Sequence, residues 1–144
     1  MKRREMKILC VDDDEDIATL LHNILSANGH AVTTSHNGVD ALSQIERDDF
    51  NLILLDLEMP GLSGKQVIDS LHKDGLLEHN KIVILSANDL SESEILEFKQ
   101  KGIEEIFQKP MQLERILDVV KKFEWKDNQS LKQSSSIMSY ILLK

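Results

Sequence analysis

Residues 51–61 read Asn51-Leu-Ile-Leu-Leu-Asp-Leu-Glu-Met-Pro-Gly61, a short apolar run that ends in an acid and a turn signal. An apolar run of this length is typical of a strand buried on both faces, as in parallel sheets. The Pro-Gly pair then closes the run with a turn. Asp56 therefore lies at the carboxyl end of a predicted buried strand, the edge where open α/β sheets place their functional groups.

The same alternation of apolar runs and amphipathic stretches extends over most of the chain. We expect strands at residues 7–11, 31–35, 52–55, 82–85 and 103–107. The second of these is the most polar, which favours a place at the edge of the sheet. Apolar residues at helical spacing predict a helix after each strand, and the last helix fades near Trp125. Ser91 and Glu94 form a predicted capping box at the start of the fourth helix.

Five strands that alternate with five helices predict a single doubly wound α/β domain with a parallel sheet. The flavodoxin-like strand order 2-1-3-4-5 fits five strands better than the six-stranded dinucleotide-binding order. In that order the first and third strands are neighbours, and a crevice opens between their carboxyl ends. We expect this domain to span residues 1–125 and the polar, serine-rich residues 126–144 to form a flexible tail.

Composition and charge restrict the class of protein and of partner. The chain has 144 residues, 41% of them hydrophobic, and a net charge of −8, which suits one globular domain and not a nucleic-acid-binding surface. Cys10 is the single cysteine, so no internal disulfide can form. No apolar segment reaches the roughly 18 residues of a membrane span, and the amino terminus lacks the pattern of a secretory signal. We expect a cytoplasmic protein without a membrane partner.

Reactive groups follow four of the predicted strands. Asp12 and Asp13 follow the first, Asp56 the third, Ser86 the fourth and Lys109 the fifth. These residues are spread over about a hundred positions, but the expected topology gathers them at one edge of the sheet. Each has an ordinary structural explanation when taken alone, such as a helix cap or a surface charge. Their shared position predicts a functional site.

A cluster of three carboxylates needs a counter-charge. Two carboxylates about 4 Å apart repel each other by about 4 kcal/mol at an effective dielectric constant near 20. Oxygen-only ligands favour Mg²⁺, and Mn²⁺ could substitute for it. None of the five histidines lies near a ligand-like partner in the sequence, so we do not expect zinc.

A metal, a free carboxylate, an ammonium and a hydroxyl at one point suit phosphoryl transfer, which depends on positioning and charge neutralisation. Asp56 would be the nucleophile and form an aspartyl phosphate. Asp12 and Asp13 would hold the metal. Lys109 would pair with the phosphoryl oxygens, and Ser86 would donate a hydrogen bond to them.

Four segments carry a resemblance to a known family. They are Ile-Leu-Cys-Val-Asp-Asp-Asp at 8–14, Leu-Leu-Asp-Leu-Glu-Met-Pro-Gly at 54–61, Leu-Ser-Ala at 85–87 and Gln-Lys-Pro at 108–110. In order and spacing, the chain from about residue 7 to residue 123 resembles the receiver domain of bacterial two-component response regulators. Each segment alone is a weak signal, whereas the set is highly specific.

The resemblance implies a switch that is phosphorylated on Asp56 and catalyses only its own phosphorylation and dephosphorylation, so that it is not an enzyme in the ordinary sense. Ser86 corresponds to the family's switch hydroxyl and Lys109 to its lysine. The peptide bond between Lys109 and Pro110 is expected to be cis. The implied metal ligands are Asp12, Asp13, Asp56 and the backbone carbonyl of Glu58.

The resemblance also implies the partners. A sensor histidine kinase or a phosphotransfer protein would supply the phosphoryl group, and a downstream protein would bind the face formed by the fourth helix, the fifth strand and the fifth helix. A homodimer that forms on phosphorylation is left open. Receivers often carry an aromatic residue where this chain has Ile106, so we expect a smaller movement of the fifth strand, with Ile106 repacking.

Two other functions stay open at this point. A phosphatase of the haloacid-dehalogenase type also uses an aspartyl nucleophile and Mg²⁺, but its acidic motif belongs on the first strand. A flavodoxin-like binding module would need a glycine- or hydroxyl-rich phosphate loop after the first strand, where this chain has acids.

Overall fold

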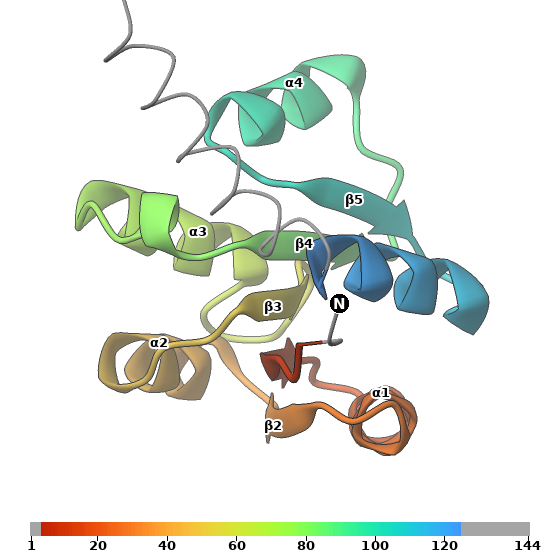
Figure 1. Cartoon of the computed structure of the whole chain (residues 1–144). Helices are drawn as coiled ribbons and strands as arrows, with labels where there is room; N and C mark the ends of the chain where they lie inside the picture. Colours follow the sequence, from red (N-terminus) through yellow and green to blue (C-terminus); the bar gives the residue numbers. More distant parts are fainter. Residues whose placement is uncertain (1–3, 125–144) are drawn as a thin grey trace, which may run out of the picture. The chain divides into compact units, whose positions relative to one another are not determined.

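The five apolar runs form the strands of one parallel sheet (Figure 1). The computed structural model describes residues 4–124. Its strands are β1 Lys7–Val11, β2 Ala31–Ser35, β3 Leu52–Asp56, β4 Ile82–Ser86 and β5 Glu105–Gln108. Their order is β2-β1-β3-β4-β5, which confirms the predicted doubly wound fold. The polar β2 lies at an edge, as its composition predicts.

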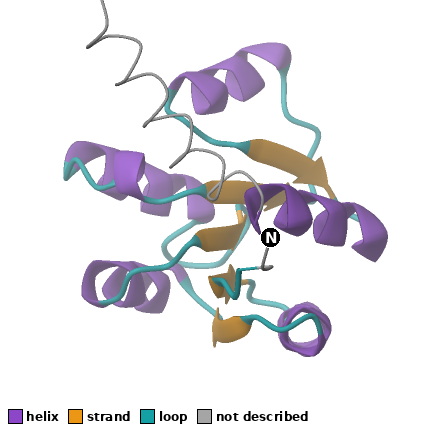
Figure 2. Ribbon diagram, viewed as in Figure 1, coloured by secondary structure: helices purple, strands orange, loops and turns teal. Residues whose placement is uncertain are grey.

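The central strands are buried because helices cover both faces of the sheet. Every residue of β3 and β4 is buried. Because side chains alternate along a strand, Ile53 and Leu55 join one apolar cluster together with Val67 of α3 and Phe98 of α4. Figure 2 shows the strands as the central layer, with helices on both sides.

Side-chain caps fix the starts of the helices α1 Glu15–Ala27, α2 Gly38–Arg47, α3 Gly64–Lys73 and α4 Glu92–Gln100. Their N-caps are Asp14, Asn37, Ser63 and Ser91, each of which accepts a backbone N–H. The capping box of Ser91 and Glu94 is present as predicted. Figure 1 shows α2 and α3 on one side of the sheet and α1 on the other.

Residues 6–111 form one compact unit, which holds the whole sheet. The described residues of a second unit are 4–5 and 112–124, of which 113–124 are helical. Within the described part of the chain, no helix is both long and apolar enough to cross a bilayer. The predicted tail, residues 126–144, lies outside the described residues.

Two local predictions differ from the structure. The fifth strand begins at Glu105 and not at residue 103, because the Ile103 N–H is already bonded to the Phe98 carbonyl at the end of α4. Ile103 is buried as a hydrophobic contact at that helix end, a common partner of a glycine cap such as Gly102, whose φ is 98°. The short 3-10 helix Leu77–His79 was not predicted. It is too short to give a periodic pattern.

Candidate phosphorylation site

Strand register brings the predicted acids together. Val11 of β1 pairs with Leu55 of β3. The next residues, Asp12 and Asp56, therefore lie side by side at the ends of these neighbouring strands. Asp56 in turn pairs with Leu85, one residue before Ser86. The functional groups therefore lie at the carboxyl edge of the sheet, as the topology predicts.

Three carboxylates form a compact cluster at this edge. One oxygen of each of Asp12, Asp13 and Asp56 lies within 4.8 Å of the others. Asp12 and Asp56 are almost completely buried, whereas Asp13 is exposed. The Asp14 N–H donates a 2.9 Å hydrogen bond to Asp12 Oδ1, which fixes that carboxylate at the start of α1.

Lys109 supplies a cation to the cluster. Its Nζ lies 2.8 Å from Asp12 Oδ2 and 3.5 Å from Asp56 Oδ2. Its backbone N–H donates to the Ser86 carbonyl at 2.7 Å, and the peptide bond to Pro110 is cis, as predicted. Burial alone would lower the pKa of Lys109, but its bonds to Asp12 and Asp56 outweigh this and raise it. Lys109 is therefore a permanent positive charge beside Asp56.

One ammonium does not neutralise three carboxylates. Burial and then the charge of Asp12 raise the pKa of Asp56 to about 7, although Lys109 acts in the opposite direction. The donor set consists of oxygens with two excess negative charges if all three acids are ionised. Hard divalent cations prefer such a set, so the cluster could hold a metal of the Mg²⁺ class.

In the unphosphorylated protein, Ser86 contacts Glu58. Its Oγ donates to Glu58 Oε1 at 2.5 Å, and the neighbouring Ala87 N–H donates to Glu58 Oε2 at 3.0 Å. The Glu58 N–H donates to Asp56 Oδ1 at 3.2 Å. The contact between the Glu58 carboxylate and Ser86 was not predicted from the sequence. The spacing of two residues from Asp56 was the available signal.

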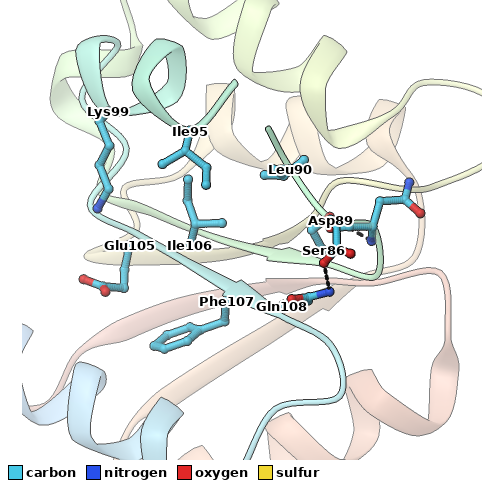
Figure 3. A pocket seen from close by; sticks show the side chains of 10 residues that line it. Ser86, Asp89, Leu90, Ile95, Lys99, Glu105, Ile106, Phe107 and Gln108 are labelled. Atoms are coloured by element: carbon cyan, nitrogen blue, oxygen red, sulfur yellow. Dashed lines mark hydrogen bonds between the residues drawn. The ribbon is translucent and has the colours of Figure 1, made fainter. Parts of the chain in front are cut away.

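A cavity of about 320 Å³ lies next to Ser86, between α4 and β5 (Figure 3). Ile106 points from β5 toward Ile95 of α4 and also packs on the apolar core. At the cavity rim, the Gln108 amide donates a short hydrogen bond to Asp89, which joins the loop after β4 to the end of β5. The cavity thus adjoins the Ser86 side of the site.

The sequence of this chain matches those of known proteins. The family model described as the response regulator receiver domain matches residues 8–121. Response regulator MprA of Mycobacterium avium is 38% identical over 112 residues, which cover 78% of this chain and 48% of that protein. MprA of Mycobacterium leprae is 37% identical over the same length. The chain spans about half the length of these curated relatives.

Solved structures agree with the sequence comparison. The Thermotoga maritima response regulator TrrA, solved in complex with Mg²⁺ and BeF, is 30% identical with a TM-score of 0.70, covering 82% of this chain and 98% of that one. The receiver domain of Francisella response regulator 1452 is 27% identical with a TM-score of 0.77, covering 85% of this chain and 99% of that one. With a matched family model, a shared fold and the acidic cluster at the expected edge, the chain belongs to the response regulator receiver domain family.

Proposed function

We propose that Asp56 is the phosphoacceptor of this receiver domain and that it takes a phosphoryl group from a sensor histidine kinase or a phosphotransfer protein. The observation that carries the proposal is the surroundings of Asp56. It is a buried carboxylate at the carboxyl edge of the sheet, with two further carboxylates within 4.8 Å and an ammonium 3.5 Å away. This set of charges suits the transfer of an anionic group to an oxygen nucleophile.

The reaction needs no general base, because Asp56 attacks as a carboxylate, the form that Lys109 and a bound cation favour. One of its oxygens forms a bond to phosphorus while the phosphorus–nitrogen bond of a phosphohistidine breaks. The electron pair of that bond goes to the imidazole nitrogen, and the product is an acyl phosphate on Asp56. Lys109 Nζ, already beside Asp56, pairs with the phosphoryl oxygens.

The proposed cofactor is Mg²⁺, with Mn²⁺ as a substitute. Its ligands would be Asp12, Asp13, Asp56 and the backbone carbonyl of Glu58. The bound ion supplies the positive charge that the three carboxylates and the incoming phosphoryl group need. The complex of the relative TrrA with Mg²⁺ and BeF supports this choice, since BeF species resemble a phosphoryl group in shape and charge.

The output would be a change of the protein surface. We propose that phosphorylation draws Ser86 and the loop after β4 toward Asp56, which alters α4 and β5 beside Ile106 and, beyond them, the fifth helix. A downstream protein would bind that face, and a homodimer that forms on phosphorylation stays open as an alternative. The domain would comprise residues 1–125 and act in the cytoplasm, as a switch and not as an enzyme with turnover.

The test is phosphorylation by acetyl phosphate and Mg²⁺, followed by intact mass spectrometry. We expect the gain of one phosphoryl group, lost in Asp56→Asn and in EDTA, and kept in the control Asp74→Asn, which removes an exposed carboxylate at the end of α3. Sustained hydrolysis of phosphate esters would favour the haloacid-dehalogenase alternative. Modification of the Asp56→Asn variant would show that another residue is the acceptor.

A further inference from the structure

The carboxylate of Glu58 binds two donors that belong to the loop after β4. Oε1 accepts from the Ser86 hydroxyl at 2.5 Å, and Oε2 accepts from the Ala87 N–H at 3.0 Å. Ser86 is buried and Glu58 half-buried, so the pair is partly shielded from water. We name this set of contacts, of Glu58 with Ser86 and Ala87, the Glu58 clamp.

The clamp is connected directly to the reacting group. Glu58 follows Asp56 by two residues, and its N–H donates to Asp56 Oδ1 at 3.2 Å. The same short loop therefore carries the proposed acceptor and the carboxylate that holds the β4 loop. The Lys109 ammonium forms its ion pairs with Asp12 and Asp56.

One donor of the clamp, the Ser86 hydroxyl, is the group that the proposed function draws toward a phosphoryl group on Asp56, and the Ala87 N–H lies next to it in the same loop. A hydroxyl has one proton and a backbone N–H has one, so neither gives a full hydrogen bond to two anions at once. Glu58 and an acyl phosphate on Asp56 would also repel each other as like charges. Glu58 and the phosphoryl group therefore compete for the Ser86 proton, and movement of the loop would also break the contact of Glu58 with Ala87.

We propose that Glu58 is an internal competitor of the phosphoryl group, a regulatory residue whose carboxylate holds Ser86 and Ala87 in the unphosphorylated state and must release them for the switch to occur. The inference rests on the proposed phosphorylation of Asp56. A ligand shifts a two-state equilibrium only through its different affinity for the two states. The clamp stabilises one of them, so it lowers the apparent affinity for a phosphoryl group.

The first experiment tests the clamp without any phosphorylation. NMR measures exchange of the Ala87 amide proton with water in the metal-free protein. We expect at least a fivefold faster exchange in Glu58→Ala and in Glu58→Asp, since aspartate is one methylene too short to reach both donors, and no change in the exposed control Glu78→Gln. Unchanged exchange in both Glu58 variants would overturn the clamp, whatever happens at Asp56.

The second experiment tests the competition. Beryllium fluoride with Mg²⁺ serves as the phosphoryl mimic, and its dissociation constant is read from the NMR signals of the β4 loop. Glu58→Ala should bind it roughly tenfold more tightly. Glu58→Asp keeps the negative charge, so it should behave like Glu58→Ala if the hydrogen bonds matter and like the wild type if only the charge does. The latter result would overturn the proposal.

A double-mutant cycle with Ser86→Ala completes the test. Without the hydroxyl, Glu58 and the mimic no longer compete for it, so Glu58→Ala should gain clearly less affinity in the Ser86→Ala background than in the wild type. Equal gains in both backgrounds would contradict the competition. If Asp56→Asn still bound the mimic equally well, the proposed function would fail, and the Ala87 exchange result would stand on its own.

Discussion

At the scale of single residues, the charge of Asp56 affects both the proposed function and the stability of the fold. Its carboxylate is buried next to Asp12 and can be neutralised by Lys109 only in part. Such an arrangement costs folding free energy when all the acids are ionised, and it attracts cations for the same reason. A site of this kind favours a bound cation, and that cation would also offset the negative charge of a phosphoryl group.

Asp56→Asn should stabilise the metal-free protein at alkaline pH. The pKa of Asp56 is raised to about 7 by burial and by Asp12, above the ordinary value of about 3.9. The stability that the raised pKa contributes to the folded protein is therefore fully present below about pH 4, and it is lost as the pH rises through about 7. We expect the variant to exceed the wild type by about 1–3 kcal/mol in free energy of unfolding at pH 8, and to match it at pH 4.

Urea unfolding in EDTA at several pH values measures this difference. Asp74→Asn serves as the control, since its carboxylate is exposed. If the wild type and Asp56→Asn kept a constant difference between pH 4 and pH 8, Asp56 would have an ordinary pKa in the folded protein.

At the scale of elements, two glycines between β3 and α3 are needed for different physical reasons. The sequence predicts a turn at the Pro-Gly pair that ends in Gly61. Gly61 does have a positive φ of 77°. Gly64 instead begins α3 against the end of β3, where an added Cβ would lie 2.2 Å from the Asp56 carbonyl oxygen. Its lack of a side chain lets the helix approach the proposed acceptor.

Gly64→Ala should therefore destabilise the protein and displace the end of β3. A Cβ at that distance forces a backbone shift, and overpacking of this kind costs about 1–3 kcal/mol. Chemical unfolding at pH 7 with Mg²⁺ measures the stability, and acetyl phosphate labelling measures the effect on Asp56. Lys65→Ala, an exposed change on the next residue of α3, is the control. A Gly64→Ala variant as stable and as readily labelled as the control would refute the steric argument.

Ile106 should move less on phosphorylation than an aromatic residue would at the same place. It is half-buried, packs on the core and faces Ile95 across a cavity that can take a small repacking (Figure 3). An aliphatic side chain has no polar tip that favours an exposed state. Structures of the free protein and of its beryllium fluoride complex decide the matter, and a swing of Ile106 between buried and fully exposed states would contradict the expectation.

At the scale of the whole molecule, metal binding should stabilise the fold by mass action. A cation that binds only the folded state at 100 times its dissociation constant adds about 2.7 kcal/mol. We expect Mg²⁺ to raise the melting temperature of the wild type relative to EDTA. Asp13→Asn removes an exposed carboxylate of the proposed metal site without disturbing the core, so it should reduce this gain. A full gain in Asp13→Asn would exclude that carboxylate from the metal site.

The sequence by itself determined the approximate positions of the strands, the cap of α4 and the order in which reactive groups follow the strands. These are local properties, because an apolar run such as 52–55 or a capping pair such as Ser91 and Glu94 acts within a few residues. The number of strands favoured the strand order and the residues at the strand ends predicted the site, whereas the family resemblance added the cis peptide bond and the carbonyl ligand of Glu58. The start of β5 was misjudged because Ile103 is buried at a helix end, and periodicity does not distinguish that burial from a strand.

Only the tertiary structure decided which atoms meet. Three contacts join residues that are not neighbours in the sequence: the 2.5 Å bond of Ser86 to Glu58, the Lys109 ammonium shared by Asp12 and Asp56, and the close approach of Gly64 to Asp56. Such contacts depend on how strands are registered and how a helix start packs on a strand end. A sequence pattern carries residue types and spacing, whereas hydrogen bonds and charge pairing depend on distances that exist only after the sheet has assembled.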